Sequence, residues 1–202
     1  MALKRSTQVQ TIHHRPGEGH VVDMTVVSTD ANSVTGQFDL GGLPVPERRF
    51  SCDSVGLQTR GTLIQLLFGQ SQPIGDGLLS MLVVNISREN VVQFLRTVGG
   101  KFSEDYLASH VGAGVDELTD FQRKADQTVV LTGSIVLAGY SGTDGCMDFY
   151  YSSPFAMQHV SVIKKMAIES VVRVNLPTGL FFAIVKRVQE VVAPLSGVTK
   201  DG

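Results

Sequence analysis

Two stretches of this sequence share one pattern. Val84-Asn85-Ile86-Ser87 is followed by RENVVQFLRTV, and Val174-Asn175-Leu176-Pro177 is followed by TGLFFAIVKRV, at an offset of 90 (175 − 85). In both, a run rich in β-branched residues leads into a segment whose apolar residues recur at the spacing of one helix face. The pattern predicts a strand and then a helix in each half of the chain, and therefore an internal repeat.

Two weaker matches extend this comparison toward the N-terminus. Residues 35–40 (TGQFDL) resemble residues 132–137 (TGSIVL) at an offset of 97 (132 − 35). The chain has two cysteines, Cys52 and Cys146, at an offset of 94 (146 − 52). We interpret the falling offset as a sign of shorter loops in the second copy. The cysteines are then expected at equivalent positions, as buried thiols.

The composition narrows the class of protein. The chain has 202 residues, 43% of them hydrophobic, which is enough for a sizeable core. The net charge of −2 and the absence of a basic stripe argue against nucleic acid as a partner. No apolar run approaches the ~20 residues of a transmembrane helix, and the polar N-terminus does not resemble a signal peptide. We expect a cytoplasmic protein that has no membrane partner and no disulfide framework.

The order of predicted elements divides the chain into five parts. These are a flexible N-terminal arm (1–19), a first β4α repeat (20–100), a partly helical connector (101–127), a second β4α repeat (128–193) and a C-terminal tail (194–202). The first repeat has predicted strands at 20–28, 34–40, 50–60, 62–69 and 78–86. The strand at 20–28 has no clear counterpart in the second repeat, unless residues near 126–131 supply one. The second repeat has predicted strands at 128–140, 146–153, 155–163 and 168–176.

The helix boundaries follow from capping residues. Ser87 is a good N-cap, and Gly99-Gly100 is a normal stop for the helix that begins at Arg88. Pro177 is expected just inside the last helix, where its missing N–H costs nothing. Residues 155–163 (FAMQHVSVI) are assigned to a strand, with a helix as the alternative. The predicted fold class is α+β, with helices packed on one face of antiparallel sheet.

Residues 54–98, and more loosely 146–190, resemble small bacterial proteins with the fold of the SecB export chaperone. The matching features are Phe68-Gly69 at the end of a strand, Pro73 in the following loop, and Ile86-Ser87 where the helix opens. This resemblance implies four strands and a helix per unit, association as dimers or dimers of dimers, and in some members a holdase activity toward unfolded polypeptide. Two copies in one chain would form an internal pseudo-dimer, with further homo-oligomers possible.

No motif in the sequence indicates an enzyme. His13, His14, His20 and Glu18 lie in a Gly/Pro-rich arm without the spacing of a metal site. Neither cysteine has a cationic activator beside it in sequence. We therefore expect no catalytic residues, no metal and no cofactor. A small enzyme whose residues converge only in the fold is the remaining enzymatic alternative.

The aromatic cluster Met147-Asp148-Phe149-Tyr150-Tyr151 is the strongest candidate for a binding surface. In an alternating strand, Phe149 and Tyr151 share one face and Tyr150 takes the other. Either these residues form sheet core, or they offer an apolar surface with Phe155 and Met157 as neighbours. We expect Tyr150, Phe155 and Met157 to bind a protein or peptide client. A structural or assembly protein of a phage or bacterial particle is the alternative function.

Overall fold

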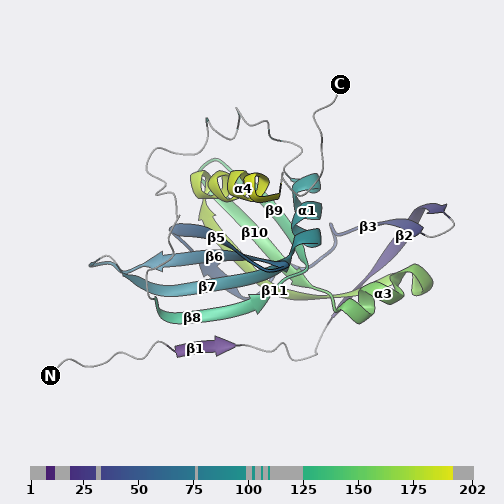
Figure 1. Cartoon of the computed structure of the whole chain (residues 1–202), viewed down its shortest axis with the longest axis horizontal. Helices are drawn as coiled ribbons and strands as arrows, with labels where there is room; N and C mark the ends of the chain where they lie inside the picture. Colours follow the sequence, from purple (N-terminus) through teal and green to yellow (C-terminus); the bar gives the residue numbers. More distant parts are fainter. Residues whose placement is uncertain are drawn as a thin grey trace.

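The structure of the chain is a computed structural model. It describes residues 8–11, 19–30, 33–75, 77–98, 102, 106, 109 and 125–192. These residues form two sheets and three helices, so the fold is mixed α+β (Figure 1). The predicted helical content of the connector, and the glycines expected to end the first helix, lie outside the described residues.

The first sheet has five strands. In spatial order they are β1 (Gln8–Thr11), β8 (Ala125–Thr132), β7 (Leu78–Ser87), β6 (Leu63–Ser71) and β5 (Ser54–Arg60). The second sheet runs β3 (Ser33–Phe38), β2 (His20–Asp30), β11 (Lys165–Pro177), β10 (Asp144–Tyr151) and β9 (Ile135–Ser141). The short β4 (Arg49–Ser51) also pairs with β11.

Most of the strand pairs are antiparallel, as predicted, but three are not. The pairs β7–β8, β1–β8 and β4–β11 are parallel. Parallel partners cannot be joined by a tight hairpin. The sequence pattern shows tight turns, so it reveals hairpins and misses these long-range pairs. Within the arm expected to be flexible (1–19), residues 8–11 form strand β1, and β8 begins at Ala125, three residues before the predicted boundary at 128.

The helices cover two different faces. Helices α1 (Arg88–Thr97) and α4 (Thr178–Val192) contact each other and pack on one side of the strands (Figure 1). Helix α3 (Pro154–Ile163) instead packs through Val160 against Met24, Met166 and Ile168, in a second core. The prediction of helices on a single face is therefore wrong for α3.

Residues 155–163 are helical, not a strand. The β-branched residues Val160, Val162 and Ile163 favoured the strand assignment. Ser153 caps the helix by accepting a hydrogen bond from the Ala156 N–H, and Pro154 occupies its first turn. The Ser153-Pro154 pair is a helix start signal that is visible in the sequence.

The larger core joins both sheets to α1 and α4. β10 sends Met147 and Phe149 into this core, where Phe149 meets Phe68 of β6. The opposite face of β10 sends Tyr150 into the smaller core beside α3. β10 is therefore buried on both faces, which explains its nearly continuous run of apolar residues.

The elements β5–β6–β7–α1 and β9–β10–β11–α4 follow the same order with the same pairing. Leu66 of β6 lies opposite Val84 of β7, and Met147 of β10 lies opposite Val174 of β11. Each helix starts with the same backbone bond. The Arg88 N–H donates to the Thr62 carbonyl at 3.2 Å, and the Thr178 N–H donates to the Thr143 carbonyl at 2.9 Å.

In each set, the strand that precedes the hairpin pairs with the other set. β4 leads into β5 but pairs with β11, and β8 leads into β9 but pairs with β7. The residue after each of these strands makes an equivalent bond. The Cys52 N–H donates to the Asn175 carbonyl at 3.0 Å, and the Gly133 N–H donates to the Asn85 carbonyl at 2.9 Å. The two sets thus exchange their leading strands.

The pairing register of the strands confirms the sequence offset of 90 but not the offsets of 97 and 94. The offset is 90 for the third strand and helix (174 − 84), as predicted, but 81 for the hairpin before it (147 − 66). The offset increases along the chain because helix α3 lies between β10 and β11, whereas β6 and β7 are joined by a short loop. Cys52 therefore corresponds to Gly133, and Cys146 to Gln65, so the cysteines are not equivalent. The β2–β3 hairpin also lies outside the shared order.

The last helix starts one residue later than expected. Pro177 ends β11, and α4 begins at Thr178. Ser87 caps α1 as predicted, and its hydroxyl accepts the Asn90 N–H at 3.3 Å.

Candidate binding surface and buried polar network

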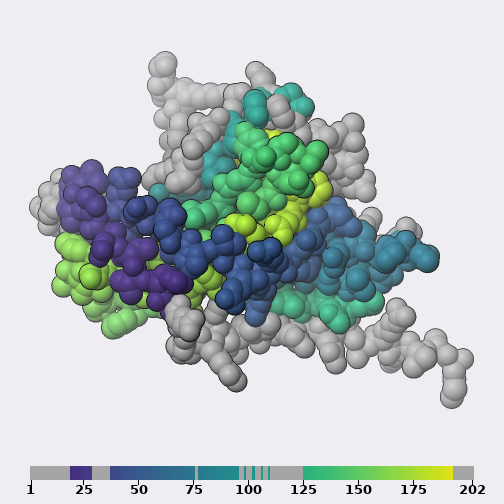
Figure 2. All heavy atoms as spheres, turned by 180° about the vertical axis from the view of Figure 1, so that it is seen from behind, coloured from purple at the N-terminus to yellow at the C-terminus, as the bar shows by residue number. Residues whose placement is uncertain are grey.

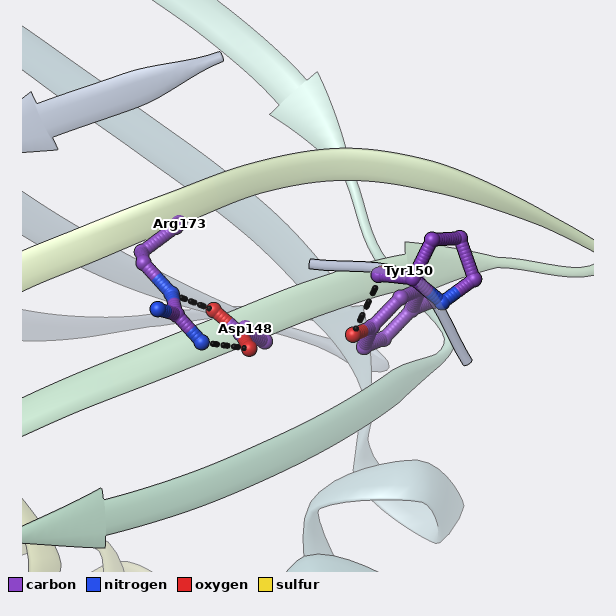
Figure 3. A network of polar contacts seen from close by, with 4 residues as sticks. Asp148, Tyr150 and Arg173 are labelled. Carbon is purple, nitrogen blue, oxygen red and sulfur yellow. Dashed lines mark hydrogen bonds and ion pairs between the residues drawn. The ribbon is translucent and has the colours of Figure 1, made fainter. Parts of the chain in front are cut away.

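The three residues predicted to bind a client do not form one surface. Tyr150 is only 2% exposed, and its hydroxyl donates to the Pro44 carbonyl at 3.1 Å (Figure 3). Phe155 is 71% exposed and Met157 38% exposed, both on α3. The side chain of Tyr150 is not exposed as expected, because the second face of β10 is covered by the smaller core. Accessible apolar surface remains at Phe155 and Met157.

Beside Tyr150, β10 and β11 carry an ion pair between directly opposite residues, Asp148 and Arg173. Arg173 Nε lies 2.6 Å from Asp148 Oδ1, and Nη2 lies 2.6 Å from Oδ2 (Figure 3). Such a two-point pairing fixes both side chains. The Asp148 side chain is 10% exposed and the Arg173 side chain 25% exposed. The pair therefore sits at the margin of the interior.

The network shifts two pKa values upward. The hydrogen bond to Asp148 raises the pKa of Arg173, which keeps its charge at any accessible pH. Burial, with the Asp148 charge nearby, raises the pKa of Tyr150 to about 12. Neither group is suited to proton transfer near neutral pH, and both carboxylate oxygens of Asp148 are engaged by Arg173.

Cys52 is also unsuited to covalent chemistry. Burial, with a smaller contribution from Asp53, raises the pKa of its thiol to about 12. A thiol of this kind is protonated near neutrality, whereas a nucleophile must be a thiolate. Among the described residues, no group of three or more His, Cys, Asp or Glu side chains is arranged to hold a metal ion. His13, His14 and Glu18 lie outside the described residues.

The exposed side of α3 carries a stripe that we call the α3 stripe: Phe155, His159, Val162 and Ile163. The residues Phe155, His159 and Val162 follow the i, i+4, i+7 spacing of one helix face. Val162 is 76% exposed and Ile163 55% exposed, while Val160 on the other side is buried. The Phe155 and His159 rings contact each other, with centroids 4.2 Å apart. α3 thus anchors itself with one residue and leaves its most apolar face in water.

Helix α3 and the β2 strand lie at the same end of the molecule (Figure 2). The Met24 N–H donates to the Lys164 carbonyl at 2.7 Å, immediately after α3 ends. Val21 of β2 lies opposite Ala167 of β11 and is 62% exposed. Met24 faces the smaller core, so Val21, an odd number of residues away, faces the other side of the sheet. Val21 is therefore not part of the α3 stripe.

No protein-family model, curated protein or solved structure matches this chain.

The sequence interpretation missed an aromatic cluster that the fold assembles from distant segments. Its members are Phe102, Tyr106, Tyr140, Phe181 and Phe182. The Tyr140 and Phe182 centroids are 4.9 Å apart, and the Tyr106 and Tyr140 hydroxyls are 3.3 Å apart. Only the adjacent Phe181-Phe182 pair is visible in sequence. The cluster brings Phe102 and Tyr106 against α4 and β9.

None of the helices in the described part of the chain has both the length and the apolar character needed to cross a membrane.

Proposed function

We propose that this chain is a non-enzymatic polypeptide-binding protein and that the α3 stripe is its contact surface. The observation that carries the proposal is the exposure of Phe155 and Val162, at 71% and 76%, on a well-capped helix. Covering such side chains releases ordered water, and a large aromatic residue is a frequent source of binding energy at protein interfaces.

The spacing of the stripe favours a polypeptide as the ligand. Residues at i, i+4 and i+7 are the anchors by which an amphipathic helix engages apolar surface of another chain. Met157, on the flank of α3, adds an adaptable side chain suited to varied partners. The resemblance to SecB-like proteins points to the same class of function, a holdase for extended or unfolded polypeptide.

The non-enzymatic part of the proposal is supported by the state of the polar groups. Arg173 engages both carboxylate oxygens of Asp148, and the Tyr150 hydroxyl donates to a backbone carbonyl. The Cys52 thiol is buried and stays protonated near neutral pH. The proposal places the protein in the cytoplasm, with no cofactor.

The fold-level part of the proposal is that the chain is a tandem pair of SecB-like units. It is supported by the shared strand order and by the matching bonds that start α1 and α4. A crystal structure tests it. Superposition of residues 49–98 on residues 130–188 should align β5, β6, β7 and α1 with their counterparts once α3 is omitted. A poor fit of these elements would refute the duplication.

The functional test is suppression of client aggregation. A chemically denatured, slowly refolding model enzyme is diluted with and without the purified chain, and light scattering is followed. We expect suppression near equimolar ratio, and loss of most of it in Phe155→Ser and Val162→Ser. The control is Val21→Ser, an exposed valine outside the stripe, which should retain suppression. Circular dichroism checks that all variants are folded.

Two results would contradict the proposal. Wild-type protein without effect at several-fold excess would favour the alternative of a structural or assembly protein. Equal suppression by all variants would place the binding surface elsewhere.

A further inference from the structure

We infer that the face of the second sheet turned away from the larger core carries an oxyanion site, formed by Arg49 and Arg173 and suited to a phosphate group. The inference goes beyond the proposed function, because it concerns neither α3 nor a polypeptide client. It comes from the register of β4 on β11, which sets the two arginines directly opposite each other. Free phosphate and a small phosphomonoester share the chemistry that such a site recognises.

The two arginines lie on the same face of adjacent parallel strands. The residues that follow them, Phe50 and Val174, also pair with each other and pack in the larger core. Side chains alternate along a strand, so Arg49 and Arg173 point away from that core. Neighbouring strands lie about 4.8 Å apart, which lets both guanidinium groups reach one ligand. Arg49 is exposed and the Arg173 side chain is 25% exposed, so a ligand in solvent has access to both.

The charges at this place do not balance. Asp148 accepts hydrogen bonds from Arg173 with both carboxylate oxygens (Figure 3). Arg49 has no hydrogen-bond or ion-pair partner among the described residues, and the exposed Glu47, two positions earlier, forms no ion pair with it. Like charges directly opposite each other on neighbouring strands are destabilising. An anion that contacts both arginines would remove this repulsion.

The unused donors favour a phosphate group over a carboxylate. A carboxylate is planar, and one edge of a guanidinium satisfies it, as Nε and Nη2 of Arg173 do for Asp148. Arg49 offers its whole fork, and Arg173 keeps the N–H groups of Nη1. These donors come from two different strands. The oxygens of a phosphate point in different directions, so they can accept hydrogen bonds from both arginines at once.

The next residues on the same face add polar groups without negative charge. Ser51 and Asn175 lie opposite each other, two positions beyond the arginines, and Cys146 of β10 lies opposite Asn175. All three are at least partly exposed. Hydroxyl, amide and thiol groups can each donate a hydrogen bond to an oxyanion. We therefore expect the phosphate to lie over the β4–β11 pair, on the side of the arginines where Asn175 lies.

Titration calorimetry of the full chain with inorganic phosphate, in chloride buffer of constant ionic strength, tests the inference. The Kd should be on the order of 1 mM, as befits one small anion at a partly exposed site. Arg49→Gln should weaken binding by about tenfold or more, and Arg49→Lys, which keeps the charge but lacks the fork, by a smaller factor. Arg60→Gln is the matched control, because it removes an exposed positive charge from the first sheet and should bind like wild type.

Thermal unfolding gives a second measurement, which an arginine without a ligand would leave unchanged. In phosphate-free buffer, Arg49→Gln should be slightly more stable than wild type, because the repulsion between Arg49 and Arg173 is gone. In about 50 mM phosphate, the Tm of wild type should rise by about 5 °C and that of Arg49→Gln should not. The order of stability of the two proteins should therefore reverse.

Three results would overturn the site. They are a wild type that binds no phosphate at about 20 mM, an Arg49→Gln variant that binds like wild type, and an equal loss in Arg60→Gln, which would indicate general charge attraction. Glycerol phosphate separates the two sources of the ligand. Tighter binding than that of inorganic phosphate supports a phosphomonoester, and weaker binding supports free phosphate. None of these results depends on the suppression of client aggregation, so the site and the proposed function can fail separately.

Discussion

The ring of Phe68 in β6 packs edge-on against the ring of Phe149 in β10, with centroids 5.8 Å apart and planes inclined by 66°. Both side chains are fully buried. They occupy matching places in the two sets of strands, because the hairpin offset of 81 (149 − 68) relates them. This contact lies where the two sheets meet in the core.

Replacing either ring should strongly destabilise the protein. Phe68→Ala and Phe149→Ala should each lower the free energy of unfolding by about 3–5 kcal/mol, because a cavity remains where a ring was packed. Urea denaturation measures the loss. A double-mutant cycle should give a coupling of about 0.5–1.5 kcal/mol for the edge-on contact. Phe155→Ala, on exposed α3, should change stability by less than about 0.5 kcal/mol.

The ion pair should be costly to break and cheap to replace. Asp148→Ala leaves the Arg173 guanidinium without its partner and should cost about 3 kcal/mol in urea denaturation. At the matching position between β6 and β7, the opposite residues are Leu67 and Val83, both buried. The double variant Asp148→Leu with Arg173→Val should therefore recover stability to within about 1 kcal/mol of wild type. A double variant as unstable as Asp148→Ala would contradict this account.

Stability should fall at alkaline pH because folding raises the pKa values of two groups, Cys52 and Tyr150. The pKa of Cys52 rises from 9.0 to about 12 on folding, and that of Tyr150 from 10.0 to about 12. Both groups are neutral in the folded state. The unfolded state therefore loses protons first, so the stabilisation present below pH 9 is lost between about pH 9 and 12.

Thermal unfolding between pH 8 and 12 checks this expectation. Cys52→Ala should flatten the fall that begins near pH 9, and Tyr150→Phe the fall that begins near pH 10. Tyr150→Phe should also lower stability at pH 7 by about 1 kcal/mol, because the Pro44 carbonyl loses its donor. Unchanged slopes in both variants would show that other groups control alkaline unfolding.

A single glycine in β10 should resist substitution. A Cβ on Gly145 would lie 3.0 Å from the Phe181 Cβ and 3.5 Å from the Leu176 carbonyl oxygen. Gly145→Ala should therefore cost about 1–3 kcal/mol, as α4 is pushed from the sheet. Gly139 in β9 is the matched control, since a Cβ there meets nothing within 4 Å. Gly139→Ala should be neutral or stabilising by up to about 1 kcal/mol. Equal effects in calorimetry would refute the steric explanation.

The sequence predicted the parts of the fold whose signals are local. The spacing of Val91, Phe94, Leu95 and Val98 and the cap at Ser87 predict α1. The run at 168–176 predicts β11. These signals lie within one turn or one strand, where periodicity and capping decide the structure.

The pairings between distant segments left no such signal. Arg49 of β4 lies opposite Arg173 of β11, and neither hydrophobic alternation nor turn residues connect them. The partner of Asp148 is 25 residues away (173 − 148), and only the register of β10 on β11 brings them together. The same register buries Tyr150, whereas the alternation within β10 alone does not show what covers its face of the strand.

The candidate surface was half predicted. Phe155 and Met157 were chosen for their chemistry, and both are exposed. The α3 stripe was not foreseen as a stripe, because a strand assignment places Phe155 and Val162 on opposite faces. The helix start signal at Ser153-Pro154 would have favoured a helix over a strand, and the helical period places Phe155 and Val162 on one face.

The exchanged strands β4 and β8 have a consequence for biosynthesis. Arg49 pairs with a residue 124 positions later (173 − 49), so the strand with which β4 pairs in the described part of the chain leaves the ribosome only after most of the chain has been made. Meanwhile β7 exposes the edge that β8 will cover. Such an open edge invites pairing with other nascent chains. A protein proposed to keep unfolded polypeptides from aggregating is therefore itself prone to aggregate while it is being synthesised.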